Sequence, residues 1–424
     1  MSAGEKVGGH FPRFLAGSLA SNLADGIMFT ALPLVAAALT NDPLLVSGLL
    51  VARFLPWLLF GLVAGVLVDR LDRGVLMVTA NLVRAAALVA LAALVATGYA
   101  SIQVLYAVMF TVMTCEVFYD LAGRAMLPRL VPVEGLDRAN GRIVGGKTVL
   151  EDFAGAPLTG LLFVVAAFLP LAVNAGAYLL GALVLLGLPL AVRRTAPEAA
   201  DGAPARPSVT AELRAGLALV FGDRAMRSPV VLNVLANMAF MAQAGVLVLI
   251  VREHFGVPEA LYGVFLASSA VGALTGALLT ARVAAALGRF GASVSGFAVM
   301  GLACAAFGLA PNAYLAALAW GVLGAAMSVS NIVMLGCVQT VVPGSHLGRV
   351  MSCVQVLGFG LAPVGALLGG LLGRVELSYV PVAAGGLILL ALLCTAPGLR
   401  RLTARANEVA AAAEAESASA PAAG

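Results

Sequence analysis

Charged residues are scarce in this sequence, and the scarcity decides the class of protein. Asp, Glu, Lys and Arg make up only 11% of the 424 residues, whereas 61% are hydrophobic. Soluble domains contain about 25% charged and roughly 45–50% apolar residues. A chain with so few polar groups cannot cover a surface in water, so an ordinary soluble globule is excluded. Lipid must be its solvent.

Residues that hold metals or cofactors are also few. The five cysteines and three histidines are scattered without ligand spacing, so we expect neither a metal site nor a disulfide framework. The net charge of +4 is distributed as single or paired basic residues, which form no continuous patch for nucleic acid. No nucleophile or acid–base pair stands in a soluble segment. We therefore expect no enzyme, no cofactor and no nucleic-acid partner.

Apolar runs of about twenty residues recur along the chain. A helix of this length spans the ~30 Å hydrocarbon core of a bilayer. Polar or Pro- and Gly-containing breaks separate the runs, and the pattern predicts twelve transmembrane helices. The expected spans are 14–39, 44–68, 74–97, 102–121, 143–165, 169–192, 229–251, 261–281, 290–309, 314–338, 350–372 and 375–396.

Basic residues lie almost entirely on one side of these spans. Of the 25 Lys and Arg residues, twenty fall on the side shared by both termini, two fall in the opposite loops, and three lie inside spans. The side rich in basic residues faces the cytoplasm in membrane proteins. We therefore expect both termini to be cytoplasmic.

The longest break between runs, residues 193–228, divides six spans from six. Its second part has apolar residues near helical spacing, which predicts a cytoplasmic linker with a helix on the membrane surface; a disordered loop with chance periodicity is the alternative. The Ala-, Glu- and Ser-rich residues 404–424 predict a disordered tail. The expected domains are 1–192, the linker 193–228, 229–403 and the tail.

A single displacement of 211 residues relates the two halves. Val131-Pro132-Val-Glu-Gly-Leu136-Asp-Arg138 shares the pattern Val-Pro-x-x-x-Leu-x-Arg with Val342-Pro343-Gly-Ser-His-Leu347-Gly-Arg349. The same displacement relates Gly61 and Gly65 to Gly272 and Gly276, and Asn22 and Phe29 to Asn233 and Phe240. Duplicated six-helix halves are predicted, and such repeats place a binding site between the halves near the bilayer midplane.

The loop between the second and third spans reads Gly65-Val-Leu-Val-Asp69-Arg70-Leu-Asp72-Arg73. It resembles the loop signature of the major facilitator superfamily. This resemblance implies an all-α integral membrane fold of twelve transmembrane helices in two pseudo-symmetric six-helix bundles. Three further segments resemble the branch that holds enterobactin exporters and macrolide efflux pumps, which implies efflux, antibiotic resistance and a bacterial inner membrane. They are Asp25-Gly26, Arg53-Phe54-Leu55-Pro56 and Gly123-Arg124-Ala125-Met-Leu-Pro128.

Two segments suggest moving parts. Gly65, Asp69, Arg70 and Arg73 are expected to latch one conformation, although the arginines could serve topology alone. Gly155-Ala156-Pro157-Leu-Thr-Gly160 in the fifth span resembles an element of the family's antiporters, with Ala156 in place of a glycine. We expect Gly155, Pro157 and Gly160, together with Pro363, to form helix pivots; generic helix packing is the alternative.

Ionisable residues inside the spans are the candidates for ion coupling, because a charge at the bilayer centre is costly. The acids are Asp25, Glu116, Asp120, Glu151 and Asp152, and the bases are Arg53, Arg84 and Lys147. The acids outnumber the bases, so full pairing requires a proton, a bound cation or water. The spacing of Asp120 with Arg124, and of Lys147 with Glu151, predicts salt bridges along one helix face. We expect Asp25, Glu116, Glu151 and Asp152 to carry the proton coupling.

The second half contains no ionisable residue well inside a span, and its polar side chains are neutral. These suit hydrogen bonding to a substrate, although polar contacts between helices explain them equally well. The expected substrate cavity combines them with polar residues of the first half: Asn22, Arg53, Arg84, Asn233, Asn237, Gln243 and Asn331.

These features together favour a monomeric, proton-coupled antiporter that works by alternating access. Its expected partners are protons, membrane lipids and a drug-like, antibiotic or siderophore-like small molecule. The main alternatives are a proton-coupled symporter for nutrient uptake and a membrane sensor that transports nothing.

Overall fold

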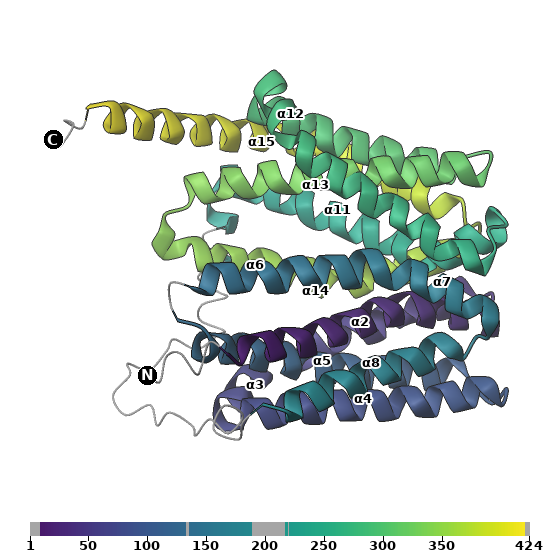
Figure 1. Cartoon of the computed structure of the whole chain (residues 1–424). Coiled ribbons are helices and arrows are strands. Elements are labelled where there is room, and N and C mark those ends of the chain that lie inside the picture. Colours follow the sequence, from purple (N-terminus) through teal and green to yellow (C-terminus); the bar gives the residue numbers. More distant parts are fainter. Residues whose placement is uncertain (1–8, 133–134, 189–216, 219, 420–424) are drawn as a thin grey trace. The chain divides into compact units, whose positions relative to one another are not determined.

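The computed structural model describes residues 9–132, 135–188, 217–218 and 220–419, and it describes some of these, including Asp69, Arg70 and Asp152, by backbone alone. Within these ranges all regular elements are helical (Figure 1). The elements are α2 (Phe11–Leu39), α3 (Pro43–Arg70), α4 (Arg73–Ala96), α5 (Ile102–Leu130), α6 (Leu136–Lys147), the π-helix η2 (Thr148–Ala154), α7 (Gly155–Val165), α8 (Leu169–Leu186), α11 (Arg224–Leu249), the π-helix η3 (Ile250–His254), α12 (Glu259–Gly308), α13 (Ala313–Val341), α14 (Gly344–Gly373) and α15 (Tyr379–Ser419). Residues 193–216 of the predicted linker lie outside the described part.

The predicted all-α membrane fold is confirmed. Eleven helices in the described residues are long and apolar enough to cross a membrane. One of them, α12, has 50 residues, and Gly288 breaks it with φ 68° and ψ 169°. Only glycine adopts such a conformation readily. Because this break separates residues 261–281 from 290–309, α12 supplies two of the twelve predicted spans.

The displacement of 211 residues recurs in the helix boundaries. Helix α5 and helix α13 both contain 29 residues, and each boundary of α13 lies 211 positions after that of α5. Their N-terminal caps correspond as well. The Ser101 side chain accepts a hydrogen bond from the Val104 N–H at 3.4 Å, and the Asn312 side chain accepts one from the Leu315 N–H at 3.0 Å. Both residue types are favoured at this position because they satisfy an N–H group of the first turn.

The described chain divides into two compact units. The first contains residues 1–204 and 245–267, and the second contains residues 205–244 and 268–424. Residues 245–267 thus belong to the first unit. The start of α12 lies there against α7: a Cβ atom added at Gly160 would come 2.6 Å from the Ala260 carbonyl oxygen, and one at Gly263 would overlap that of Ala156. Glycine at both positions allows this backbone contact.

In the first unit, α2 packs on α8, α8 packs on α4, and α5 packs on both α3 and α4. An apolar core fills one end of this arrangement. It includes Phe14, Met77, Met126, Leu130 and Leu185, each at most 2% exposed. The outer helix faces carry exposed apolar side chains such as Leu58, Leu59 and Val63. An apolar surface of this kind requires lipid around it.

In the second unit, small residues bring helix backbones together. A Cβ atom added at Gly272 would overlap the Gly321 carbonyl oxygen, and one at Gly369 would overlap that of Ala242. Lipid does not drive helices together by the hydrophobic effect, so such close van der Waals packing holds membrane helices in place. Trp320 stacks with Phe240 at 5.9 Å and packs on Phe307 at 5.3 Å between ring centroids.

The C-terminal segment differs from the predicted disordered tail, because α15 continues as a helix to Ser419. Alanine and glutamate have high helix propensity, which favours continuation of a helix that already exists. The segment is also attached to the second unit. Arg405 forms an ion pair with Asp223 at 2.9 Å, and Arg289 donates a hydrogen bond to the Ala406 carbonyl at 2.9 Å.

The glycine contact predicts a selective loss of stability. The substitution Gly272→Ala should destabilise the protein by about 1–3 kcal/mol, because the added methyl group forces two backbones apart. The matched control is Gly336→Ala, where an added Cβ atom meets no heavy atom within 4 Å. Thermal unfolding of the purified protein in detergent measures both. Equal unfolding temperatures for the two variants would contradict the packing described here.

Candidate transport site

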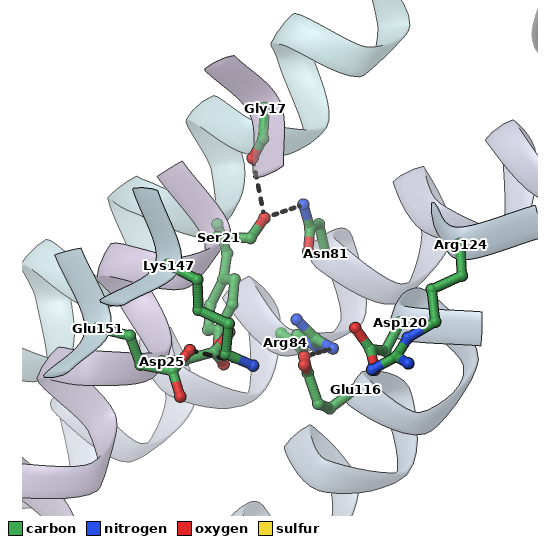
Figure 2. Close-up of polar contacts among 11 residues, drawn as sticks. Gly17, Ser21, Asp25, Asn81, Arg84, Glu116, Asp120, Arg124, Lys147 and Glu151 are labelled. Atoms are coloured by element: carbon green, nitrogen blue, oxygen red, sulfur yellow. Dashed lines mark hydrogen bonds and ion pairs between the residues drawn. The ribbon is translucent and has the colours of Figure 1, made fainter. Parts of the chain in front are cut away.

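The first unit holds a cluster of ionisable side chains around the crossing of α2 and η2. A Cβ atom added at Gly26 would lie 2.5 Å from the Glu151 carbonyl oxygen, and one at Gly155 would overlap the Gly26 carbonyl carbon. The two backbones therefore touch. The Thr159 hydroxyl also donates a hydrogen bond to the Ile27 carbonyl at 3.2 Å. This crossing fixes Glu151 beside the turn of α2 that carries Asp25 (Figure 2).

The π-helix follows from a proline. Pro157 has no N–H group, so it cannot bond the carbonyl of the residue four positions earlier. The preceding segment widens to π geometry, in which the Gly155 N–H donates to the Leu150 carbonyl. Such widened turns are frequent at functional sites. The predicted pivot residues Gly155 and Pro157 thus shape the helix that carries Glu151, and Gly160 packs on the start of α12. Whether the helix pivots there stays a prediction.

Arg84 of α4 and Glu116 of α5 form an ion pair. The Arg84 side chain is fully buried, and its guanidinium lies 5.0 Å from the ring centroid of Tyr119 and 5.1 Å from that of Tyr178. The electron-rich faces of the two rings attract the cation. Within the described residues, Nε and Nη1 of Arg84 have no hydrogen-bond partner. A single carboxylate and two aromatic rings hold this charge.

Asp25 of α2 has a neutral partner. Its side chain is 2% exposed and accepts a hydrogen bond from the Tyr178 hydroxyl at 2.5 Å. In the described part of the chain, no cation lies within ion-pairing distance of its carboxyl group. Tyr178 of α8 therefore contacts both Asp25 and Arg84. Tyr178 is not among the predicted site residues; the signal for it in the sequence is a hydroxyl in the middle of the sixth apolar run.

The two salt bridges that helical spacing predicts are present. Lys147 pairs with Glu151 at 3.3 Å, and Arg124 pairs with Asp120 at 3.0 Å. The Arg124 side chain is 77% exposed, so this second pair lies at the edge of the cluster (Figure 2). The Asp152 side chain lies outside the described residues.

The inner cluster contains one acid more than bases. Its acids are Asp25, Glu116 and Glu151, and its bases are Arg84 and Lys147. Arg84 pairs with Glu116 and Lys147 with Glu151, so Asp25 is the acid that no base neutralises among these five residues. A buried group of this kind can hold a proton and exchange it when its surroundings change.

Other polar residues of the first unit lie on α2, α3 and α4. The Asn81 amide donates to the Ser21 hydroxyl at 2.9 Å, one helical turn before Asp25. The predicted cavity residue Asn22 is partly buried on α2. Arg53 of α3 lies over the Phe29 ring, 3.5 Å from its centroid. Arg53 and Arg84 thus contact different aromatic rings, and their shared place in one substrate cavity stays a prediction.

The second unit contains a neutral cavity of about 210 Å³ between α11, α12 and α13. Its walls are Asn233, Ala236, Asn237, Phe297, Met300, Met327, Ser330 and Asn331. Three of the predicted cavity residues, Asn233, Asn237 and Asn331, thus come together. Gln243 does not line this cavity: it is fully buried and donates a hydrogen bond to the Cys304 sulfur at 3.1 Å.

The structure describes the side chain of Arg73 but not those of Asp69 and Arg70 in the predicted latch. Arg73 donates a hydrogen bond to the Ala125 carbonyl of α5 at 3.0 Å, which ties the start of α4 to the Gly123–Ala125 turn. A Cβ atom added at Gly65 would meet no heavy atom within 4 Å. The side chains of Asp69 and Arg70 lie outside the described residues, so their role stays a prediction.

Residues 141–148, Gly-Arg-Ile-Val-Gly-Gly-Lys-Thr, match the pattern of a phosphate-binding loop. Such a loop connects a strand to a helix and turns free backbone N–H groups toward phosphate. Here the segment runs through α6 into η2, where N–H groups bond within the helix, and Lys147 pairs with Glu151. The match therefore arises by chance in a helical segment and does not indicate a phosphate-binding site.

Comparison with known proteins decides the family. A family model for transmembrane secretion effectors of the major facilitator superfamily matches residues 9–420. The chain belongs to this family. The predicted membership of the superfamily is confirmed, and the family and fold are those of membrane transporters.

Two relatives of this family member cover nearly its whole length. The chain is 27% identical over 405 residues to YfiS of Bacillus subtilis, an uncharacterized transporter of the same superfamily, covering 91% of this chain and 92% of that protein. It is 24% identical over 384 residues to macrolide efflux protein A of Streptococcus pyogenes, covering 89% and 93%. Among solved structures, a bacterial homologue of the iron transporter ferroportin aligns over 95% of this chain and 100% of its own, with a TM-score of 0.73 and 14% identity. The nucleoside transporter NupG aligns over 91% and 98%, with a TM-score of 0.67 and 14% identity.

The buried ion pair predicts strong coupling between its members. Arg84→Met should leave the Glu116 carboxylate buried without a cation, and Glu116→Gln should leave the guanidinium without its anion. Each change should destabilise the protein by about 3–5 kcal/mol, whereas the double variant should lose much less than the sum. Thermal unfolding in detergent provides all three values. Additive losses would show that the two side chains do not depend on one another.

Proposed function

We propose that this chain is a proton-coupled exporter, which expels a drug-like, antibiotic or siderophore-like small molecule in exchange for protons. The observation that carries the proposal is the environment of Asp25, a buried carboxyl group with a tyrosine hydroxyl rather than a cation as its partner. Neutral acids are far cheaper to bury than carboxylates. Asp25 is therefore the group that binds the proton.

Proton release requires that the surroundings of Asp25 change during the transport cycle. Arg84 contacts the ring of Tyr178, whose hydroxyl binds Asp25, and Lys147 pairs with Glu151, whose backbone touches Gly26. Either cation stabilises the carboxylate if it approaches, and this expels the proton. Tyr178 links Asp25 to Arg84, so a shift of α8 changes both contacts together. Alternating access couples this local change to movement of the substrate.

Export as the direction, and a drug-like molecule as the cargo, are supported by the similarity to macrolide efflux protein A. In this proposal the protein is a monomer in a bacterial inner membrane, surrounded by lipid, with both termini in the cytoplasm. The loop from Gly65 to Arg73 latches one conformation. The glycines and prolines of α7 and α14, among them Pro363, allow the helices to bend.

The decisive test uses inverted membrane vesicles with an imposed pH gradient, acidic inside, and a radiolabelled macrolide. Wild-type vesicles should accumulate the macrolide, because the interior corresponds to the outside of the cell. Asp25→Asn should abolish accumulation driven by the gradient, since an amide cannot carry the proton. The matched control is Asp120→Asn, which removes an acid at the edge of the cluster and should retain accumulation.

Each alternative gives a different result in this assay. Accumulation at the native rate by Asp25→Asn would contradict the assignment of the proton to Asp25. Accumulation in wild-type vesicles that does not respond to the gradient would contradict proton coupling. No accumulation by wild-type vesicles would contradict export of this class of molecule.

A further inference from the structure

The cavity of the second unit occupies the positions that the charged cluster occupies in the first. A displacement of 211 residues takes Asp25 to Ala236, Glu116 to Met327, Tyr119 to Ser330 and Asp120 to Asn331. All four of the resulting residues line the cavity. The same displacement takes Arg84 to Ser295, on the part of α12 that corresponds to α4. The duplicated bundle thus has neutral, mostly smaller side chains where the first bundle has an ion pair, and an open space results.

The walls of this cavity combine two kinds of surface. Asn233, Asn331 and Ser330 provide uncharged hydrogen-bonding groups, and Phe297, Met300 and Met327 provide an apolar face. The Asn237 amide already donates to the Gly358 carbonyl at 3.0 Å, and the Ser330 hydroxyl to the Ala326 carbonyl at 2.8 Å. Their oxygen atoms can still accept hydrogen bonds. In the described part of the chain, the side chains of Asn233 and Asn331 form no hydrogen bond, so their amides can donate and accept.

The volume and the absence of charge limit what can bind. A cavity of about 210 Å³ equals the volume of about seven water molecules at ~30 Å³ each, which suits a substituted six-membered ring. No Asp, Glu, Lys or Arg is among the residues that line it. A charged group would find no counter-charge there. Thioether side chains adapt to varied apolar shapes.

We propose that this cavity binds an uncharged ring of the exported molecule, one that bears hydroxyl or carbonyl groups on one face and is apolar on the other. The proposal rests on the export function above and adds the chemistry of the cargo. Proton exchange and ligand recognition are then divided between the two copies of one ancestral site. The first copy keeps its ionisable groups, and the second has exchanged them for a neutral space.

A macrolide is a suitable probe because it carries rings with hydroxyl and carbonyl groups and apolar faces. Equilibrium binding of radiolabelled erythromycin to the purified full-length protein in detergent measures affinity without transport. Asn331→Leu should weaken binding by about tenfold or more, because it removes hydrogen bonds and narrows the cavity. Asn331→Gln keeps an amide and should bind within a few fold of wild type.

Two controls separate binding from folding and from transport. Gln339→Leu removes an exposed amide from the same helix, outside the residues that line the cavity, and should leave affinity unchanged. Asp25→Asn should still bind erythromycin, because Asp25 does not line this cavity. Bound erythromycin should raise the unfolding temperature of wild type, Gln339→Leu and Asp25→Asn, but not that of Asn331→Leu.

The possible failures are distinguishable. Native affinity in Asn331→Leu would overturn the cavity as a ligand site, whatever the vesicle assay shows. No binding of erythromycin by wild type would overturn the proposed ligand chemistry. Binding that follows the proposal, together with gradient-driven transport by Asp25→Asn, would overturn only the proton assignment.

Discussion

The organisation of the first bundle depends on the cost of charge in hydrocarbon. A charged side chain at the centre of a bilayer costs about 2.5–3.5 kcal/mol even on insertion scales, so it persists only with a partner or a function. Arg84 meets this requirement through Glu116 and two tyrosine rings. Lys147 meets it through Glu151. Asp25 stands beside these pairs with a tyrosine hydroxyl, and a bound proton is the simplest way to keep such a group neutral.

The two bundles share a backbone arrangement but have different side chains at corresponding positions. The helix boundaries of α5 and α13 still correspond residue by residue, so the backbone has been retained. Met327 and Asn331 stand where Glu116 and Asp120 stand in the first bundle. In the proposed function one copy performs proton exchange, so the second does not need paired charges at these positions. If both members of an ion pair are replaced by neutral residues, the second bundle is left with no isolated buried ion.

Much of the fold was predicted from the sequence, because each segment that crosses the lipid must be apolar along its own length. Apolar length marked the spans, and helical spacing identified the Lys147–Glu151 and Asp120–Arg124 pairs. The Arg84–Glu116 pair was not predicted, because it depends on how α4 and α5 are rotated against each other. Tyr178 was missed for the same reason. The helical end of α15 was missed because composition alone does not reveal its attachment to Asp223 and Arg289.

Infrared spectroscopy tests the central claim, that Asp25 is a protonatable carboxyl group in the resting protein, without any knowledge of the substrate. Protonated carboxyl groups have a C=O stretching band that is distinct from those of carboxylates and amides. Spectra of wild type and Asp25→Asn in lipid, recorded over the pH range of the cell, isolate the band of this one residue. The account predicts a protonated-carboxyl band that is present in wild type, changes with pH and is missing from Asp25→Asn. Identical spectra of the two proteins at every pH would contradict it.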